Sequence, residues 1–387
     1  MLSERTKLVI ILLVTLAYRA TNNMLQTSVP LYAKYVLGQS DFTVSVIVAL
    51  ANISAILSLL YLGYSSMRVG KSIFLSLAFT CVCLPLFLVT WNVVSLALVN
   101  LFVTFWIGTL MPLLLATVVL VSGPLFRERN LTIFYAVLSL SLVLGPIYQG
   151  AVLAATNDNL ISSMLCFAPL VAAAAVLFLP LLRSEGKLEV AGQKVGILFV
   201  RDPRYWMGIL AFESFNLPFI AIATFGGIFA KNSYGASYGV IETLFTAFFF
   251  TSLIVRIILV RFPSRNEPIM LLSFLVMGIG LLMWAFSSSF WDLTLSLVLL
   301  GSAHGSTYPI ATRHIADSVS REKTVGAFTV CLLIDDAVSL AGAPLLGLIA
   351  ELFGLSSLFL TLEVPVLGIG LGYTVMMRRA LTQNIGG

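Results

Sequence analysis

Residues 94–122 read VSLALVNLFVTFWIGTLMPLLLATVVLVS, an apolar run without a single charged side chain. A helix needs about 20 mostly apolar residues to cross the hydrocarbon core of a bilayer, so this segment predicts a membrane-spanning helix. Eleven further segments share this character and complete a set of twelve expected spans. The spans are 8–33, 43–64, 72–91, 94–122, 131–155, 161–182, 205–230, 238–260, 268–287, 291–315, 325–350 and 356–377.

The composition of the whole chain indicates the same class, an all-α membrane protein. Of its 387 residues, 59% are hydrophobic and only 10% are charged, whereas a soluble domain carries about 25% charged residues. A soluble, disordered or disulfide-rich secreted protein is thereby excluded. The four cysteines lie inside apolar runs without metal-ligand spacing, so we expect no metal and no cofactor.

The basic residues are distributed unevenly among the predicted loops. With the N-terminus in the cytoplasm, 17 of the 22 Lys and Arg residues fall in cytoplasmic segments, and the opposite loops hold only Lys34 and Lys231. Because basic residues favour the cytoplasmic side, we expect a multi-pass protein of the cell (plasma or inner) membrane with both termini cytoplasmic. The same split accounts for the net charge of +5 without nucleic acid as a partner.

An internal repeat divides the chain near its midpoint. Residues 18–22 (YRATN) align with 212–216 (FESFN), and residues 127–129 (RER) align with 321–323 (REK) at the same offset. Residues 145–150 (GPIYQG) have a counterpart in residues 342–347 (GAPLLG). The repeat predicts six-helix bundles over 1–182 and 205–387, joined by a cytoplasmic linker over 183–204, which is a transporter architecture.

Residues 63–72 (GYSSMRVGKS) resemble the loop 2–3 signature of the major facilitator superfamily, Gly-x-Leu-Ala-Asp-Arg-x-Gly-Arg-Lys. Gly63, Arg68, Gly70 and Lys71 match that signature, while Met67 stands at its acidic position. The resemblance extends over essentially the whole chain. It implies twelve transmembrane helices in two pseudo-symmetric six-helix bundles that transport by alternating access.

The fifth span resembles the drug:proton antiporter branch of this superfamily. Gly145, Pro146 and Gly150 match the Gly-Pro motif of that branch, and Gln149 occupies one of its glycine positions. Asn100 stands where the branch has an intramembrane arginine. The resemblance implies that the matching residues of the loop signature and the helix motif act in conformational change.

A polar stripe marks the first span. Thr15, Arg19, Asn22, Asn23 and Gln26 fall within about 80° of one helix face at 100° per residue. A charge near the middle of a membrane is costly, so it marks a functional candidate. We expect the last four of these residues to bind substrate from a cavity wall. The alternative is a structural arginine that pairs with another helix.

The deep acidic residues lie in the second half of the chain. Glu213 and Asn216 share one face of the seventh span, where Pro218 is expected to break the helix, and both are predicted to bind substrate. Glu213 is the repeat partner of Arg19, so we hypothesise that these two form an ion pair in one transport state. Glu242 lies close to the outer membrane surface and is less informative.

Two adjacent carboxyl groups, Asp335 and Asp336, lie in the eleventh span. Burial and mutual repulsion favour the protonated form of at least one of them, so both are predicted to couple transport to protons, together with Glu213. The alternative is that one of the pair caps an arginine or a broken helix end. His304 and Tyr308 share a face of the tenth span and are candidates for substrate contact, the alternative being a satisfied core histidine.

These features predict a secondary active transporter. One deep cation, Arg19, against three deep acids favours proton-coupled export of amphipathic or cationic compounds, as in multidrug efflux by a proton antiporter. The alternative is proton-coupled uptake of a small polar or anionic solute, such as a sugar or organic acid, bound by Arg19. No nucleophile–base set, HExxH motif or Walker loop occurs, so an enzyme is not expected. The expected partners are a small-molecule substrate, protons and membrane lipid, with the chain as a monomer.

Overall fold

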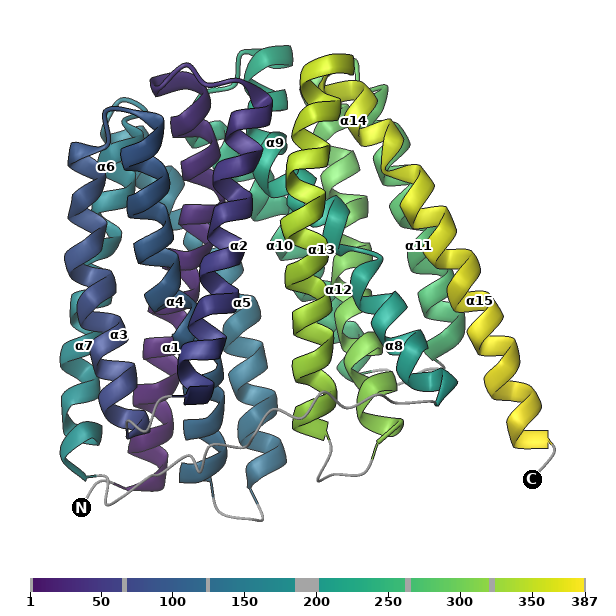
Figure 1. Ribbon diagram of the computed structural model, residues 1–387, viewed down its shortest axis with the longest axis horizontal. Coiled ribbons are helices and arrows are strands. Elements are labelled where there is room, and N and C mark those ends of the chain that lie inside the picture. Colours follow the sequence, from purple (N-terminus) through teal and green to yellow (C-terminus); the bar gives the residue numbers. More distant parts are fainter. Residues whose placement is uncertain are drawn as a thin grey trace. The chain divides into compact units, whose positions relative to one another are not determined.

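The computed structural model describes residues 3–64, 68–122, 126–184, 202–261, 266–319 and 324–385. Every regular element in these ranges is a helix (Figure 1), which confirms the predicted all-α class. The chain divides into two compact units. Unit 1 comprises Met1–Gln39, Leu50–Lys194 and Ser237–Thr246, and unit 2 comprises Ser40–Ala49, Val195–Ala236 and Ala247–Gly387.

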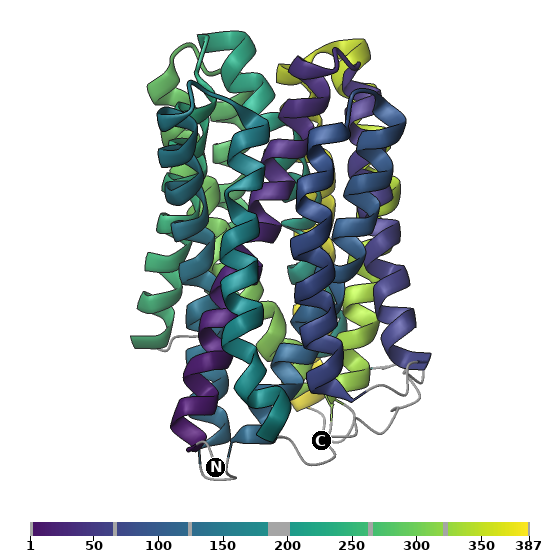
Figure 2. The same cartoon turned by 90° about the vertical axis from the view of Figure 1, so that its left-hand side faces the viewer.

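Unit 1 is a helical bundle in which α1 packs against α4, α5 and α7 (Figure 2). Helix α1 (Glu4–Leu31) continues into a π-helical turn (Tyr32–Val36). The other helices are α3 (Val69–Cys83) with a 3-10 extension (Leu84–Val89), α4 (Val93–Val121), α5 (Arg127–Ala155), α6 (Leu160–Leu165) and α7 (Phe167–Ser184). Most of the second half of α1 is buried in protein, so its polar side chains are kept away from lipid.

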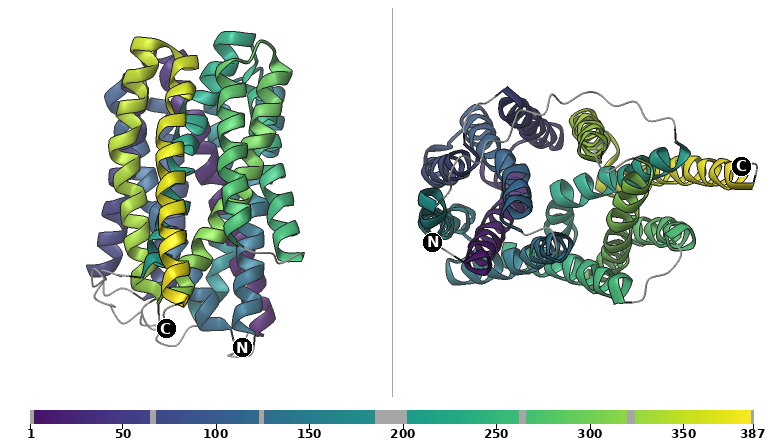
Figure 3. Two further views of the ribbon diagram at one scale, coloured as in Figure 1. Left: turned by 90° about the vertical axis from the view of Figure 1, so that its right-hand side faces the viewer. Right: turned by 90° about the horizontal axis from the view of Figure 1, so that it is seen from below.

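Unit 2 is a second bundle, in which α12 packs against α8 and α11. Its helices are α8 (Pro203–Glu213), α9 (Asn216–Tyr234), α11 (Asn266–Ala285), α12 (Phe290–Asp317), α13 (Thr324–Phe353), α14 (Leu355–Thr361) and α15 (Glu363–Ile385). Helix α15 lies at the periphery of this unit and packs on α8 and α11 (Figure 3).

Helices α2 (Asp41–Tyr64) and α10 (Tyr238–Arg261) are each divided between the two units. The first part of α2 belongs to unit 2, where the backbone N–H of Phe42 donates to the Glu351 carboxylate at 2.9 Å. The first part of α10 belongs to unit 1, where the backbone N–H of Gly239 donates to Asp158 Oδ1 at 3.0 Å. Each helix therefore begins in one compact unit and ends in the other.

The observed helices follow the expected spans closely. Eleven helical segments among the described residues are long and apolar enough to cross a membrane. The one remaining expected span, 291–315, is the tenth along the chain and corresponds to α12, which is equally long but carries more polar side chains. Large apolar side chains such as Trp91, Trp291 and Val364 are exposed, as expected for surfaces that face lipid. The prediction of twelve spanning helices is confirmed.

The seventh expected span is interrupted, and this break positions the candidate site. Helix α8 ends at Glu213 and α9 begins at Asn216. Pro218 has no N–H to donate to the carbonyl four residues earlier, at Ser214, so the helical ladder fails there. The Ser214 hydroxyl instead donates to the Ala211 carbonyl at 2.7 Å, which satisfies one acceptor at the break.

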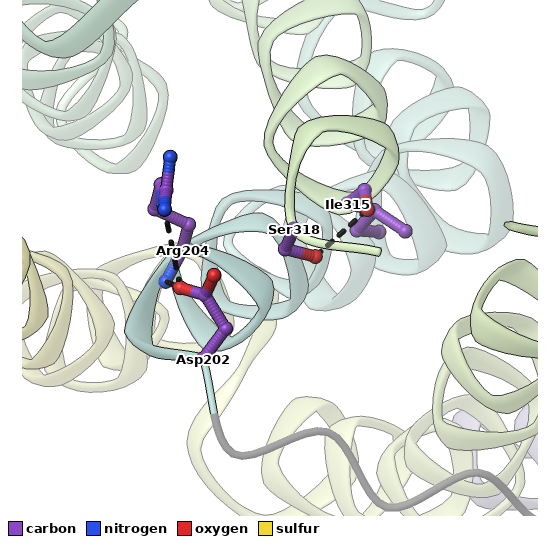
Figure 4. A network of polar contacts seen from close by, with 4 residues as sticks. All are labelled: Asp202, Arg204, Ile315 and Ser318. Carbon is purple, nitrogen blue, oxygen red and sulfur yellow. Dashed lines mark hydrogen bonds and ion pairs between the residues drawn. The ribbon is translucent and has the colours of Figure 1, made fainter. Parts of the chain in front are cut away.

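The end of unit 2 that carries the start of α8 is fixed by local polar contacts (Figure 4). Asp202 caps α8 by accepting the backbone N–H of Arg204 at 2.8 Å, and it also forms an exposed ion pair with the Arg204 side chain at 3.4 Å. At the end of α12, the Ser318 hydroxyl donates to the Ile315 carbonyl at 2.8 Å. The predicted linker over 183–204 lies mostly outside the described residues, so the domain boundary stays a prediction.

Candidate functional site

The broken helix α8–α9 presents a buried carboxyl group. Glu213 is the last residue of α8 and is only 7% exposed, and Asn216, the first residue of α9, is 3% exposed. The Asn216 side-chain amide donates to Glu213 Oε2 at 3.0 Å. Within the described chain, Glu213 Oε1 has no hydrogen-bond partner, although it is buried. A buried polar atom without a partner is costly, so this oxygen is available to a proton or a ligand.

Asn216 also ties the break to the middle of α13. Its amide donates to the backbone carbonyl of Asp335 at 3.0 Å, and its Oδ1 accepts the Ser339 hydroxyl at 3.0 Å. One turn further along the same face of α13, the absence of a side chain at Gly342 leaves room for Leu217 of α9. The face of α13 that carries Ser339 therefore packs on the start of α9.

Three carboxyl groups gather around this network. Asp335 and Asp336 are half-buried on α13, and both interact electrostatically with Glu213. Like charges this close repel one another in a medium of low dielectric constant. A proton or a cationic ligand would relieve that repulsion, so the group is suited to bind one or the other.

An aromatic cluster surrounds His304 in the same unit. The centroid of its ring lies 5.0 Å from that of Tyr308, 5.2 Å from those of Phe215 and Phe248, and 5.6 Å from that of Phe219. Ser252 Oγ lies 2.8 Å from His304 Nδ1. His304 thus has the environment of a satisfied buried histidine. Its predicted contact with substrate stays a prediction.

Tyr308 is more accessible than His304. Its ring is half-buried and packs edge-on against Phe212 of α8, with ring centroids 4.7 Å apart and planes at 89°. Phe212 directly precedes Glu213 in the chain. Aromatic rings next to a carboxyl group suit a ligand that is both apolar and positively charged.

The predicted polar stripe lies on α1 in unit 1. Arg19, Asn22 and Gln26 are half-buried, while Thr15 is fully buried and donates to a carbonyl one turn earlier at 2.7 Å. Asn23 is 1% exposed, and its Nδ2 has no partner among the described residues. Gln26 Oε1 is likewise buried and unpartnered there. These atoms leave hydrogen-bonding capacity for water or a polar solute.

The Gly-Pro motif lies on α5 and packs against α1 and α10. A Cβ atom at Gly145 would come within 3.3 Å of the Ala20 backbone, which is tighter than most Cβ contacts, so glycine favours the close approach of α5 to α1. Pro146 follows within the helix. One turn later, Gln149 Nε2 donates to Ser28 Oγ at 2.6 Å, and Gly150 approaches α10. The motif therefore sets helix spacing in unit 1.

The loop signature is described only in part. Gly63 lies in the last full turn of α2, and Met67 falls outside the described residues. Arg68 immediately precedes α3, where its carbonyl accepts the Ser72 N–H at 3.0 Å. Gly70 is buried and Lys71 is exposed in the first turn of α3. Their predicted role in conformational change stays a prediction.

One buried acid was not expected from the sequence. Glu242, in the second turn of α10, is only 1% exposed and packs against Gly150 of α5. A position only a few residues from the end of a helix predicts a side chain near the surface. The sequence of one helix does not show which neighbouring helices cover that position. Gly150 is the feature of the sequence that could have indicated this burial, because a glycine allows a neighbouring helix to pack closely.

The family follows from comparison with known proteins. Residues 11–235 and 217–382 match the model of the Major Facilitator Superfamily. The chain belongs to the major facilitator superfamily. No curated protein matches the chain in sequence.

Solved structures agree with this fold. A bacterial homologue of the human lysosomal transporter Spinster, inward-facing and unoccupied, has a TM-score of 0.80 and 14% identity over 98% of each chain. A POT family transporter in complex with 5-aminolevulinic acid has a TM-score of 0.77 and 13% identity over 96% of each chain. The nucleoside transporter NupG has a TM-score of 0.73 and 11% identity, covering 96% of this chain and 99% of its own. This superfamily protein thus has the fold of small-molecule transporters.

Proposed function

We propose that this superfamily member is a secondary transporter that exports cationic or amphipathic organic compounds in exchange for protons. The observation that carries the proposal is Glu213, a buried carboxyl group with one unpartnered oxygen among the described residues. Embedded ionisable groups are expensive and mark ion or substrate pathways in membrane proteins. In this proposal Glu213 binds the cation or a proton, and Asn216 holds its carboxyl group in place.

The neighbouring residues have distinct roles in this proposal. Asp335 and Asp336 carry the coupling proton, because their repulsion with Glu213 makes full ionisation of all three groups unfavourable. Tyr308 and Phe212 supply the aromatic surface for an amphipathic ligand. Arrival of a proton and departure of a cation then leave the net charge of the site unchanged, which is the requirement for exchange.

Several further expectations belong to the same proposal. The Gly145–Gly150 segment acts in conformational change, as the antiporter resemblance implies, and Arg19 pairs with Glu213 in one transport state. The protein works as a monomer in the cell membrane with both termini cytoplasmic. Transport in this proposal proceeds by alternating access of the two bundles.

A second candidate function is uptake of a small polar or anionic solute. The observation that favours it is the α1 stripe, where Asn23 Nδ2 and Gln26 Oε1 are buried without partners among the described residues. Amides of this kind bind hydroxyl groups, and Arg19 supplies a cation for a carboxylate or phosphate.

Transport into proteoliposomes with an imposed pH gradient tests both candidates. Transport of a panel of organic cations that includes ethidium is compared with transport of lactate. Both are measured in the wild type and in variants in which acidic residues are replaced by their neutral amides. We expect gradient-driven transport of a cation that falls about tenfold or more in Glu213→Gln and in the Asp335→Asn, Asp336→Asn double variant. Glu4→Gln is the matched control, because this acid is exposed in the first turn of α1. Transport that ignores the gradient and survives these changes contradicts proton exchange, and lactate transport lost in Arg19→Ala supports uptake.

A further inference from the structure

Glu242 occupies a tightly enclosed position in unit 1. A Cβ atom at Gly150 of α5 would lie 3.4 Å from the Glu242 Cβ atom, so the two helices are nearly in contact at this level. From α1, the hydroxyl of Thr27 faces the carboxyl group. The glutamate is therefore enclosed by α1 and α5 as well as by its own helix.

The carboxyl group has no firm hydrogen bond. The Thr27 hydroxyl donates weakly to backbone carbonyls one turn earlier, at 3.3 and 3.4 Å. In the described part of the chain, neither Oε1 nor Oε2 of Glu242 has a partner by geometry. An ionised carboxylate left in this state would carry a large desolvation cost without compensation.

The groups that face Glu242 do not supply a positive charge. The second half of α1, residues 20–31 (ATNNMLQTSVPL), contains no ionisable side chain. The turn that continues α1 adds Lys34 and also Tyr35, whose ring packs on Tyr238, but neither of them acts electrostatically on Glu242. On α5, residues 145–155 hold only Tyr148, whose hydroxyl donates to the Cys166 carbonyl at 2.9 Å. The loop after α5 contributes Asp158, an acid that accepts the Gly239 N–H, and α10 itself contributes Tyr238.

A neutral carboxyl group fits this environment. Its O–H is a donor, and the Thr27 oxygen that faces it from α1 is an acceptor. Protonation of Glu242 thus removes the buried negative charge and at the same time provides an O–H donor for a hydrogen bond. Loss of that proton would leave a bare charge between α1, α5 and α10.

We propose that Glu242 is a proton-binding site separate from the Glu213 network, and that the first two turns of α10 pack onto α1 and α5 only while Glu242 carries its proton. Helix α10 continues into unit 2, so this site links protonation in unit 1 to a helix that serves both units. The inference goes beyond the proposed substrate exchange and does not depend on which solute is carried.

The test measures the spacing of α5 and α10 in the full chain. Nitroxide labels are placed at the exposed positions Ala155 and Val240, after the four native cysteines are replaced by alanine, and their distance is measured in nanodiscs from the dipolar broadening of the continuous-wave EPR spectrum, which detects short separations. In wild type we expect one short distance at mildly acidic pH and loss of that population at alkaline pH. In Glu242→Gln, which is neutral at every pH, we expect the short distance throughout.

Two further variants keep the test decisive. Glu242→Asp retains an ionisable group and should retain the response to pH. Glu213→Gln removes an acid of the other network and should also retain it. A wild-type distance that does not change with pH, or a Glu242→Gln variant with the wild-type response, overturns the proposal. Since no substrate is present, failure of this test is distinct from failure of the proposed transport function.

Discussion

The hydrogen bonds that join the α8–α9 break to α13 all involve the side chain of Asn216, so the loss of this side chain should have a measurable effect on stability. Asn216 makes three hydrogen bonds of 3.0 Å, to Glu213 Oε2, to the Asp335 carbonyl and from the Ser339 hydroxyl. A neutral hydrogen bond contributes about 1 kcal/mol and one to a charged group about 1.5–3 kcal/mol. Asn216→Ala is therefore expected to lower the free energy of unfolding by roughly 3–5 kcal/mol.

The assay is thermal unfolding of the purified protein in detergent. At about 2 °C per kcal/mol for a large chain, Asn216→Ala should lower Tm by roughly 5–10 °C. Ser339→Ala removes one of the three bonds and should lower Tm by about 2 °C. Thr243→Ala, which loses a hydrogen bond within an exposed turn of α10, is the matched control and should change Tm little.

The ranking of these variants decides the matter. If Asn216→Ala is no less stable than Ser339→Ala, Asn216 does not hold the break to α13 and the reasoning fails. Asn216→Ala should also leave the Glu213 carboxyl group without the amide that holds it in place. The transport rate should therefore fall by more than the loss of folded protein accounts for. A variant with lowered Tm but wild-type transport would show that the link is structural only.

Further predictions concern helix packing and the aromatic cluster. Gly347→Val should drive α2 away from α13, because a Cβ atom at this position would collide with Ser45. In a chain that also carries Ser45→Cys, Gly347→Val should therefore raise the rate at which a thiol reagent modifies that cysteine. Gly370→Val is its control, since the nearest neighbour is the Phe274 side chain at 3.5 Å, and equal rates in both variants would contradict the packing. Ser252→Ala removes the partner of the buried His304 Nδ1, at a cost of about 1 kcal/mol, and should lower Tm by about 2 °C. An unchanged Tm would show that this contact contributes nothing to stability.

Much of the fold could be predicted from the sequence because the bilayer imposes a length on each apolar run. The expected spans 94–122 and 238–260 differ from α4 (Val93–Val121) and α10 (Tyr238–Arg261) by no more than one residue at either end. The break near Pro218 is a local effect of a missing N–H, so it was also predictable. The assignment of Glu213 and Asn216 to one face rests on helical periodicity, and the structure joins them by a hydrogen bond.

The remaining features depend on contacts between segments distant in the chain. Asn216 meets Asp335 and Ser339 only because α9 packs on α13, and no local pattern specifies that pairing. Glu242 lies close to a helix end in the sequence, yet α1 and α5 bury it. The sequence alone thus determined which segments enter the membrane and which side chains share a helix face, since both follow from local length and periodicity. Only the tertiary structure decided which polar groups meet and which are sealed from water, because burial is set by neighbouring helices rather than by position along one of them.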